Sequence, residues 1–169
     1  MKTIVTRVAR CVGLGLVAVS VLAPLGAGLV PATALAKAAT GRYVVSGDGE
    51  VVTDTRTKLE WQRKVVAGEK NWNDAKTYCD ALVLSGNSDW RLPWVRELSS
   101  IVDKKEAAPS IDKEAFPNTA AANFWSASLS AGSSSDAWYV DFNLGSVGYN
   151  VISNPYGVRC VRGSGGRRC

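Results

Sequence analysis

The chain has 169 residues, a formal net charge of +5 and no histidine. The absence of histidine excludes Ser-His-Asp and Cys-His nucleophiles, a histidine general base and the common histidine-containing zinc sites. A chain of this length is sufficient for one domain around one hydrophobic core. The composition therefore favours a single domain that is not an enzyme.

The first 36 residues are typical of a secretory signal. Three basic residues precede a stretch, residues 11–36, that is almost wholly apolar or small and ends in the small-x-small cleavage site Ala34-Leu35-Ala36. An uncleaved membrane anchor is the alternative, because the apolar stretch approaches a spanning length. Interrupting prolines and glycines favour the signal. We therefore expect an exported bacterial protein, periplasmic, cell-surface or secreted, that meets the membrane only during export.

Cleavage after residue 36 would remove three of the 20 basic side chains and none of the 15 acidic ones, which leaves a net charge of +2. The remaining chain divides into a short linker, residues 37–42, a domain, residues 43–163, and a basic tail, residues 164–169. Because the domain is nearly neutral, we expect no nucleic-acid partner.

Three short strands are predicted at the start of the domain, at residues 43–45, 51–53 and 59–61. They are rich in valine and aromatic residues and are separated by polar turns. Period-2 alternation places Leu59 and Trp61 on one face.

A first helix is predicted from Asn71, a suitable N-cap, with Asp74 at capping-box spacing. It should end at Ser85-Gly86-Asn87, because glycine readily adopts the left-handed conformation that terminates a helix. The residues that helical spacing places on its buried face are Trp72, Ala75, Cys79 and Leu82.

A second helix is predicted from Pro93 or Trp94 to about Asp103, because apolar residues recur there at helical period. Trp94 occupies the N-cap position, where a Ser, Thr or Asn side chain would complete a capping box with Glu97. Half of the capping box is therefore missing. Residues 104–123 show no steady periodicity and should be irregular.

The last part of the domain is predicted to be β-structure. Residues 124–128 and 147–152 favour strands, and residues 130–135 favour a flexible Gly/Ser loop. Between them, residues 137–142 alternate cleanly, and a last strand covers residues 156–160. The expected inward residues are Trp138, Val140, Phe142, Tyr156, Val158 and Cys160, and the expected outward ones are Tyr139 and Asp141. Short antiparallel strands with two helices in the first half predict an α+β fold.

Five sequence patterns occur in order along residues 43–163. They are Trp-x-x-Ala-x-x-x-Cys from Trp72, Asp-Trp-Arg-Leu-Pro-x-x-x-Glu-Leu from Asp89, Phe-Trp-Ser from Phe124, Ala-Trp-x-Val-x-Phe from Ala137, and Val-Arg-Cys-Val-Arg from Val158. Together they resemble the Lcl C-terminal domain family, a domain of unknown function named for a bacterial collagen-like adhesin. That family is similar in fold to C-type lectin-like domains and to formylglycine-generating sulfatase-modifying enzymes. The resemblance therefore implies a C-type lectin-like fold.

The resemblance also implies a structural disulfide between Cys79 and Cys160, the helix-to-last-strand bridge of lectin-like domains, which suits an exported protein. Cys169 is then left over, as a terminal thiol, an intermolecular disulfide or a competitor of Cys79. A degenerate formylglycine-generating-type oxidase is the least favoured alternative, because Cys160 is already paired and lies nine residues from Cys169.

No metal or other cofactor is expected. Trp72-Asn73-Asp74 imitates a lectin calcium signature, but it opens a helix, and helix capping explains it. Calcium remains a weaker alternative, because oxygen ligands are available in the late loops. These residues, which are more often turn formers, are Asp136, Asp141, Asn143, Asn150 and Asn154.

We expect an exported, non-catalytic binding domain that recognises acidic glycans or a protein partner at the cell envelope. A structural envelope domain without a small ligand is the alternative. The residues expected to bind a polyanion are Arg159, Arg162, Arg167 and Arg168, with Lys104 and Lys105 in support. The expected exposed aromatic contacts are Trp94, Tyr139 and Tyr149, whereas the tryptophans expected in the core are Trp61, Trp72, Trp125 and Trp138.

Overall fold

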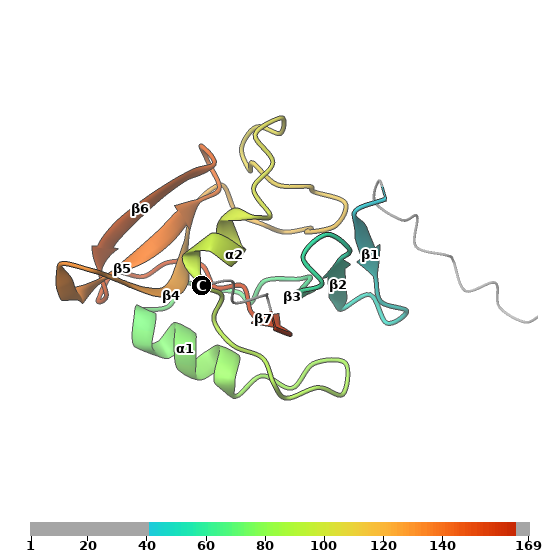
Figure 1. Cartoon of the computed structure of the whole chain (residues 1–169), viewed down its shortest axis with the longest axis horizontal. Coiled ribbons are helices and arrows are strands. Elements are labelled where there is room, and N and C mark those ends of the chain that lie inside the picture. Colours follow the sequence, from blue (N-terminus) through green and yellow to red (C-terminus); the bar gives the residue numbers. More distant parts are fainter. Residues whose placement is uncertain (1–40, 165–169) are drawn as a thin grey trace, which may run out of the picture. The chain divides into compact units, whose positions relative to one another are not determined.

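The computed structural model describes residues 41–164 of the chain. Two antiparallel sheets and two helices make up this part, which confirms the α+β class (Figure 1). The predictions for the secretory signal, for most of the linker and for Arg167, Arg168 and Cys169 lie outside the described residues. No helix within residues 41–164 is long and apolar enough to cross a membrane.

The first sheet joins the two ends of the domain. Its strand order is β1-β2-β3-β7, all antiparallel. The strands are β1 (Tyr43–Val45), β2 (Val51–Asp54), β3 (Glu60–Gln62) and β7 (Val161–Arg162). In the pairing of β3 with β7, Trp61 lies opposite Val161. The chain therefore ends beside the strands with which the domain begins.

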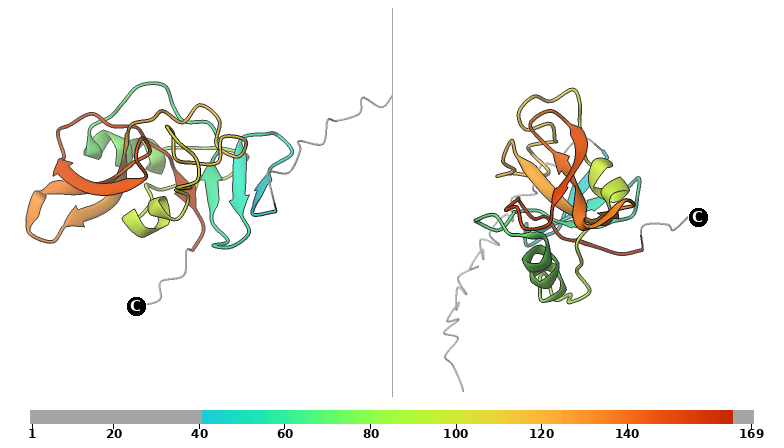
Figure 2. Two further views of the ribbon diagram at one scale, coloured as in Figure 1. Left: turned by 90° about the horizontal axis from the view of Figure 1, so that it is seen from above. Right: turned by 90° about the vertical axis from the view of Figure 1, so that its left-hand side faces the viewer.

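The second sheet is a three-stranded meander in the order β4-β5-β6. Its strands are β4 (Asn123–Ser130), β5 (Ser133–Asp141) and β6 (Ser146–Val151). The predicted flexible loop at residues 130–135 is wrong, because Ser130 pairs with Ser133 across a two-residue turn. The two sheets lie toward opposite ends of the described domain (Figure 2).

Helix α1 (Trp72–Asp80) begins as the sequence predicts. The Asn71 side chain accepts a hydrogen bond from the Asp74 backbone N–H at 3.0 Å, and a buried face meets the core. The helix ends earlier than predicted, because Gly86 belongs to a separate tight turn. Leu84 and Asn87 exchange two backbone hydrogen bonds of 3.0 Å around that turn.

Helix α2 (Val95–Ser99) is shorter than predicted, although it starts where expected. The Glu97 carboxylate accepts a hydrogen bond from the Trp94 backbone N–H at 2.8 Å. The Trp94 indole is a donor only, so it cannot accept a capping hydrogen bond from the backbone of the helix. After Ser99 the chain continues in turns, and Val102 pairs with Ile111. The apolar residues that suggested a longer helix are buried through these turns instead.

The segment predicted as a last strand, residues 156–160, passes between the two sheets without forming one strand. Tyr156 pairs with Lys70, and Gly157 pairs with Phe124 of β4. Because both sides of this segment meet protein, Arg159 is buried together with its neighbours Val158 and Cys160.

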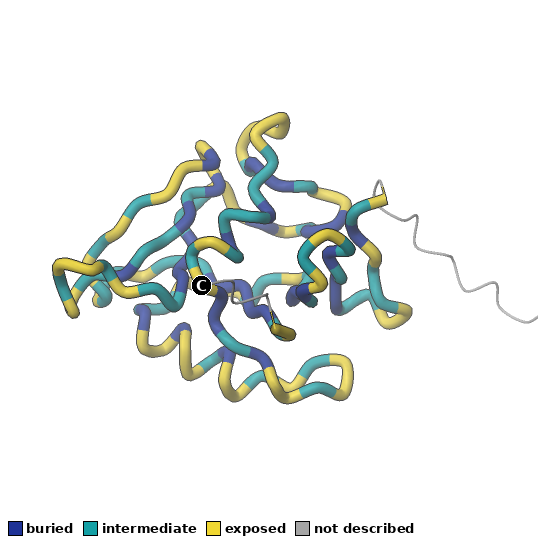
Figure 3. The backbone as a smooth tube through the Cα atoms, in the orientation of Figure 1, coloured by how far each residue is buried: buried dark blue, intermediate teal, exposed yellow. Residues whose placement is uncertain are grey.

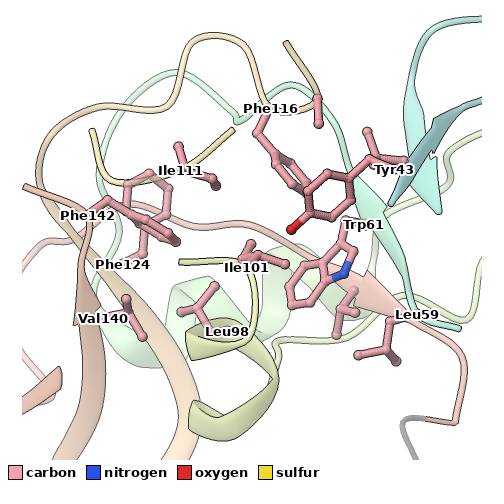
Figure 4. Packing of buried hydrophobic residues seen from close by; sticks show 13 residues of the cluster. Tyr43, Leu59, Trp61, Leu98, Ile101, Ile111, Phe116, Phe124, Val140 and Phe142 are labelled. Carbon is pink, nitrogen blue, oxygen red and sulfur yellow. The ribbon is translucent and has the colours of Figure 1, made fainter. Parts of the chain in front are cut away.

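The hydrophobic core has two clusters. The first lies between the first sheet, α2 and the inner part of the second sheet, and includes the edge-to-face pair Tyr43–Phe116 at 5.0 Å between ring centroids (Figure 4). The second lies between α1 and the other face of β4 and β5, around Trp125 and Ala137. Exposed residues gather at turns, at hairpin ends and along the outer side of α1 (Figure 3).

The predicted disulfide between Cys79 and Cys160 is confirmed. The two Cα atoms lie 5.5 Å apart, across a sequence separation of 81 residues. The bond joins α1 to the segment that precedes β7, inside the second core cluster. A disulfide of this kind is typical of exported proteins.

Candidate functional site

The residues of the Asp-Trp-Arg-Leu-Pro pattern hold α2 in place. Arg91 forms two hydrogen bonds of 2.7 Å to the two carboxylate oxygens of Glu97, and its backbone pairs with Val161 of β7. Trp90 and Leu92 are buried in the second core cluster. This pattern therefore builds the scaffold and anchors α2 to the first sheet.

The Phe-Trp-Ser pattern of β4 has a similar role. The Trp125 indole N–H lies 3.0 Å from the Lys70 carbonyl and 3.2 Å from that of Asn154, and Phe124 is buried in the first cluster. The Ser126 hydroxyl donates to the Trp138 carbonyl at 2.7 Å. These two patterns are thus mainly structural.

A groove of about 440 Å³ lies between α2 and the second sheet. Helix α2 forms one wall, and β5 and β6 form the other. The Val95 backbone N–H donates to the Ser128 hydroxyl of β4 at 3.1 Å, which fixes the helix against the sheet. The residues that line the groove are Val95, Arg96, Ser99, Ser100, Trp138 and Val147.

Aromatic and aliphatic side chains surround the groove on its sheet side. Trp138 lies opposite Tyr149 in the β5–β6 pairing, and their rings meet edge to face at 5.4 Å between centroids. Tyr149 is 58% exposed on this face; Trp94 is 49% exposed but precedes α2 and does not line the groove. This part of the sheet face thus presents aromatic surface to solvent.

Arginines supply the charge at the helix side of the groove. Arg96 is exposed on α2 and makes no salt bridge within residues 41–164. Arg42 and Arg56 donate to the Ser100 carbonyl at 2.7 and 3.1 Å, at the C-terminal end of α2. Arg42 is neutralised by Asp54 at 2.7 Å, whereas Arg56 has no salt bridge in the described part of the chain.

The prediction that Arg159 binds a polyanion is wrong, because this side chain is buried completely. Its guanidinium donates to the carbonyls of Gln62 and Arg63 at 2.6 and 2.9 Å and to the Thr119 hydroxyl at 2.7 Å. It also lies over the Phe116 ring, 4.8 Å from the centroid. Burial lowers the pKa of Arg159 to about 9.

Arg162 reaches the surface, but its charge is compensated. Its Nε donates to Asp89 at 2.6 Å and Nη1 donates to Glu60 at 2.5 Å. These bonds raise the pKa of Arg162, with the Asp89 hydrogen bond as the largest cause. Lys104 and Lys105 are exposed in the loop after α2 and do not line the groove. The members of the predicted basic set that lie within residues 41–164 therefore do not form one free cationic patch.

The two sides of β5 differ from the prediction. Tyr139, expected to face solvent, packs on the second core cluster, 6.4 Å from Trp125 and 5.2 Å from Tyr156 between ring centroids. Trp138, expected in the core, is only partly buried and lines the groove. Both sides of β5 meet apolar groups, so alternation alone could not identify the side that opens to solvent. Trp94 and Tyr149 are exposed as predicted.

The late Asp and Asn residues serve turns and strand ends. Asp141 accepts from the Asn143 backbone N–H at 2.7 Å, and Asn150 donates to the Tyr156 hydroxyl at 2.8 Å. Within residues 41–164, no three acidic, cysteine or histidine side chains lie close enough together to hold a metal ion.

The fold and the groove define a disulfide-bonded α+β domain with a basic and aromatic surface site. The model of the Lcl C-terminal domain matches residues 50–162, about two thirds of the chain. The chain therefore belongs to the Lcl C-terminal domain family. No curated protein matches it.

Proposed function

We propose that this is an exported, non-catalytic domain that binds an acidic polysaccharide in the groove between α2 and the second sheet. The disulfide supports export, and the lectin-like fold that the sequence resemblance implies would suit a role in binding. Neither catalysis nor a cofactor is part of the proposal.

The aromatic side of the groove suits a sugar ring. Trp138 forms part of the groove wall, and Tyr149 extends its aromatic surface toward solvent. The apolar face of a sugar ring packs against aromatic surface, and burial of that surface contributes on the order of 25 cal/mol per Å². Ser99 and Ser100, on the opposite wall, offer hydroxyls to sugar oxygens.

The observation that carries the acidic part of the proposal is Arg96, which lines the groove and makes no salt bridge within residues 41–164, with Arg56 nearby at the Ser100 carbonyl. A guanidinium can bind a sulfate or carboxylate group through two parallel hydrogen bonds. No acidic side chain of the described segment, residues 41–164, lines the groove. The site therefore favours sulfated or carboxylated sugars over neutral ones.

Substitution of Arg96 tests the proposal. We expect Arg96→Ala to weaken binding of a sulfated polysaccharide about tenfold, because a lost charge-assisted hydrogen bond costs roughly 1.5 kcal/mol. Binding should be measured by calorimetry at low and at high salt, and it should weaken as salt screens the charges.

Lys76→Ala is the matched control, because it removes one exposed positive charge from α1 without touching the groove. It should leave the affinity almost unchanged. Equal losses in the two variants would mean that binding depends on net charge and not on this groove. No binding by the unsubstituted protein at low salt would overturn the proposal.

A further inference from the structure

Strand β6 is an open edge of the second sheet, whereas the opposite edge is covered. On the β4 side, the Trp125 backbone N–H donates to the Gly157 carbonyl at 3.0 Å, and that of Ala127 donates to the Pro93 carbonyl at 2.7 Å. Among the strands of residues 41–164, β6 has β5 as its one neighbour (Figure 1). Polar backbone groups on its outer side are therefore available to a further strand.

The register identifies which groups point outward. The Ile152 backbone N–H donates to the Ser135 carbonyl at 2.9 Å, so these two residues form a hydrogen-bonded pair. Hydrogen-bonded and non-hydrogen-bonded pairs alternate along an antiparallel ladder. Gly148 lies four residues before Ile152, so it also forms a hydrogen-bonded pair, with Tyr139 of β5. The intervening residues Val147, Tyr149 and Val151 direct their N–H and C=O groups away from β5.

The end of this edge is closed by local hydrogen bonds. The Val151 backbone N–H donates to the side-chain oxygen of Asn150 at 2.8 Å, and its carbonyl accepts from the Asn154 N–H at 3.0 Å. The outward groups of Val147 and Tyr149 have no such bonds within residues 41–164. Two donors and two acceptors remain, placed symmetrically about Gly148.

The side chains of β6 do not protect this edge. Natural edge strands usually carry lysine, proline or an inward charge that prevents pairing with another chain. The sequence of β6, SVGYNV, contains no charged residue and no proline. Val147 is 46% exposed and Tyr149 is 58% exposed on one face. A second copy of the strand would therefore meet no like charge on β6.

We propose that β6 pairs antiparallel with β6 of a second copy of this chain, about a two-fold axis through Gly148. Val147 of each copy then lies opposite Tyr149 of the other, and the four outward N–H groups find the four outward carbonyls. The two meanders form one six-stranded sheet. Opposite residues of an antiparallel pair lie on the same face, so Val147 and Tyr149 of the two copies pack together.

The dimer has a consequence that rests on the proposed function. A two-fold axis perpendicular to the sheet places both grooves on one face of the joined sheet, where a long polysaccharide can meet both. The second contact is then intramolecular, which raises the avidity without a new contact type.

Sedimentation equilibrium of the protein recovered from cells that express the full chain tests the inference. We expect a mass twice that of one chain. Tyr149→Pro removes an outward N–H that β5 does not use, so it should give a folded monomer. Tyr149→Thr, which keeps the N–H, should retain a detectable dimer. A monomeric unsubstituted protein at every concentration, or a Tyr149→Pro dimer, would refute the pairing.

A charge exchange gives an independent test. The V147K/Y149K and V147E/Y149E variants place like charges opposite each other in a homodimer and should each be monomeric. Mixing them should restore a one-to-one dimer, because each lysine then faces a glutamate. A mixture that remains monomeric would also contradict the register.

Failure of the dimer is distinguishable from failure of the proposed function. A monomeric protein whose polysaccharide affinity still depends on Arg96 would keep the binding site and remove the pairing. A dimer that depends on β6 but does not bind polysaccharide would keep the pairing and remove the proposed binding site.

Discussion

Arg159 is a fully buried guanidinium, and its hydrogen-bond partners within residues 41–164 include no carboxylate. Its bonds join β3 to the loop that contains Thr119, so one side chain connects segments far apart in the sequence. Charged groups are costly to bury unless they are paired or hydrogen-bonded. The backbone carbonyls of Gln62 and Arg63 together with the Thr119 hydroxyl compensate part of this cost, while the Arg159 Nε has no hydrogen-bond partner within residues 41–164.

We predict that Arg159→Met lowers the free energy of unfolding by about 3 kcal/mol, because it leaves buried acceptors without donors. Urea unfolding is the measurement. Arg162→Met, which breaks two surface ion pairs, should cost at most about 1 kcal/mol and serves as the control. Equal losses would show that the contacts of Arg159 add no special stability.

The sequence could not indicate this role of Arg159. Alternation along residues 156–160 assigned Val158 and Cys160 to the core and Arg159 to solvent, as it would for a strand with one exposed face. The segment instead passes between two sheets, and only the long-range packing shows that both of its sides are covered.

At the scale of elements, α2 is a short helix whose position depends on tertiary contacts. A helix of five residues has little stability of its own. Its contacts with Arg91 and Ser128 and the burial of Leu98 hold it against both sheets. The shape of the groove therefore depends on the Arg91–Glu97 pair.

We predict that Glu97→Gln lowers the free energy of unfolding by about 1.5 kcal/mol and weakens polysaccharide binding, because the paired charge that positions α2 is lost. Chemical unfolding and calorimetric binding should be measured on the same variant. Glu50→Gln, which affects an exposed pair with Lys64, should leave both quantities nearly unchanged. If Glu97→Gln lowered the stability without changing the polysaccharide affinity, the position of α2 would not contribute to the binding site.

Elements with strong local signals were predictable. The cap at Asn71, the start of α2 and the presence of a strand at β5 are encoded in neighbouring residues, although the side of β5 that opens to solvent is not. The groove was not predictable, because Arg96, Trp138 and Val147 come from three elements that meet only in the folded domain. Arg96, Ser99 and Ser100 do share helical spacing, and this polar stripe was the one local sign of a helix face beside a groove.

At the scale of the whole described domain, the Cys79–Cys160 disulfide and the pairing of β3 with β7 connect the beginning and the end of the fold. The disulfide lies in the second core cluster, away from the residues that line the groove. It should therefore affect stability more than affinity.

We predict that Cys79→Ala together with Cys160→Ala lowers the free energy of unfolding by about 4.5 kcal/mol, the chain-entropy value for a loop of this length. Urea unfolding with and without a reductant measures this difference. The reductant should destabilise the unsubstituted protein and leave the double variant unaffected. An unsubstituted protein that is insensitive to complete reduction would contradict the structural role of the disulfide.

The central claim is that the groove between α2 and the second sheet binds an acidic polysaccharide. Its most direct test is NMR chemical-shift mapping of the protein titrated with a sulfated oligosaccharide. We predict that the largest changes occur at Arg96, Ser99 and the Trp138 indole N–H, with the buried Trp61 indole unaffected. Changes confined to Arg162 or to Lys104 and Lys105, or no changes at low salt, would contradict it.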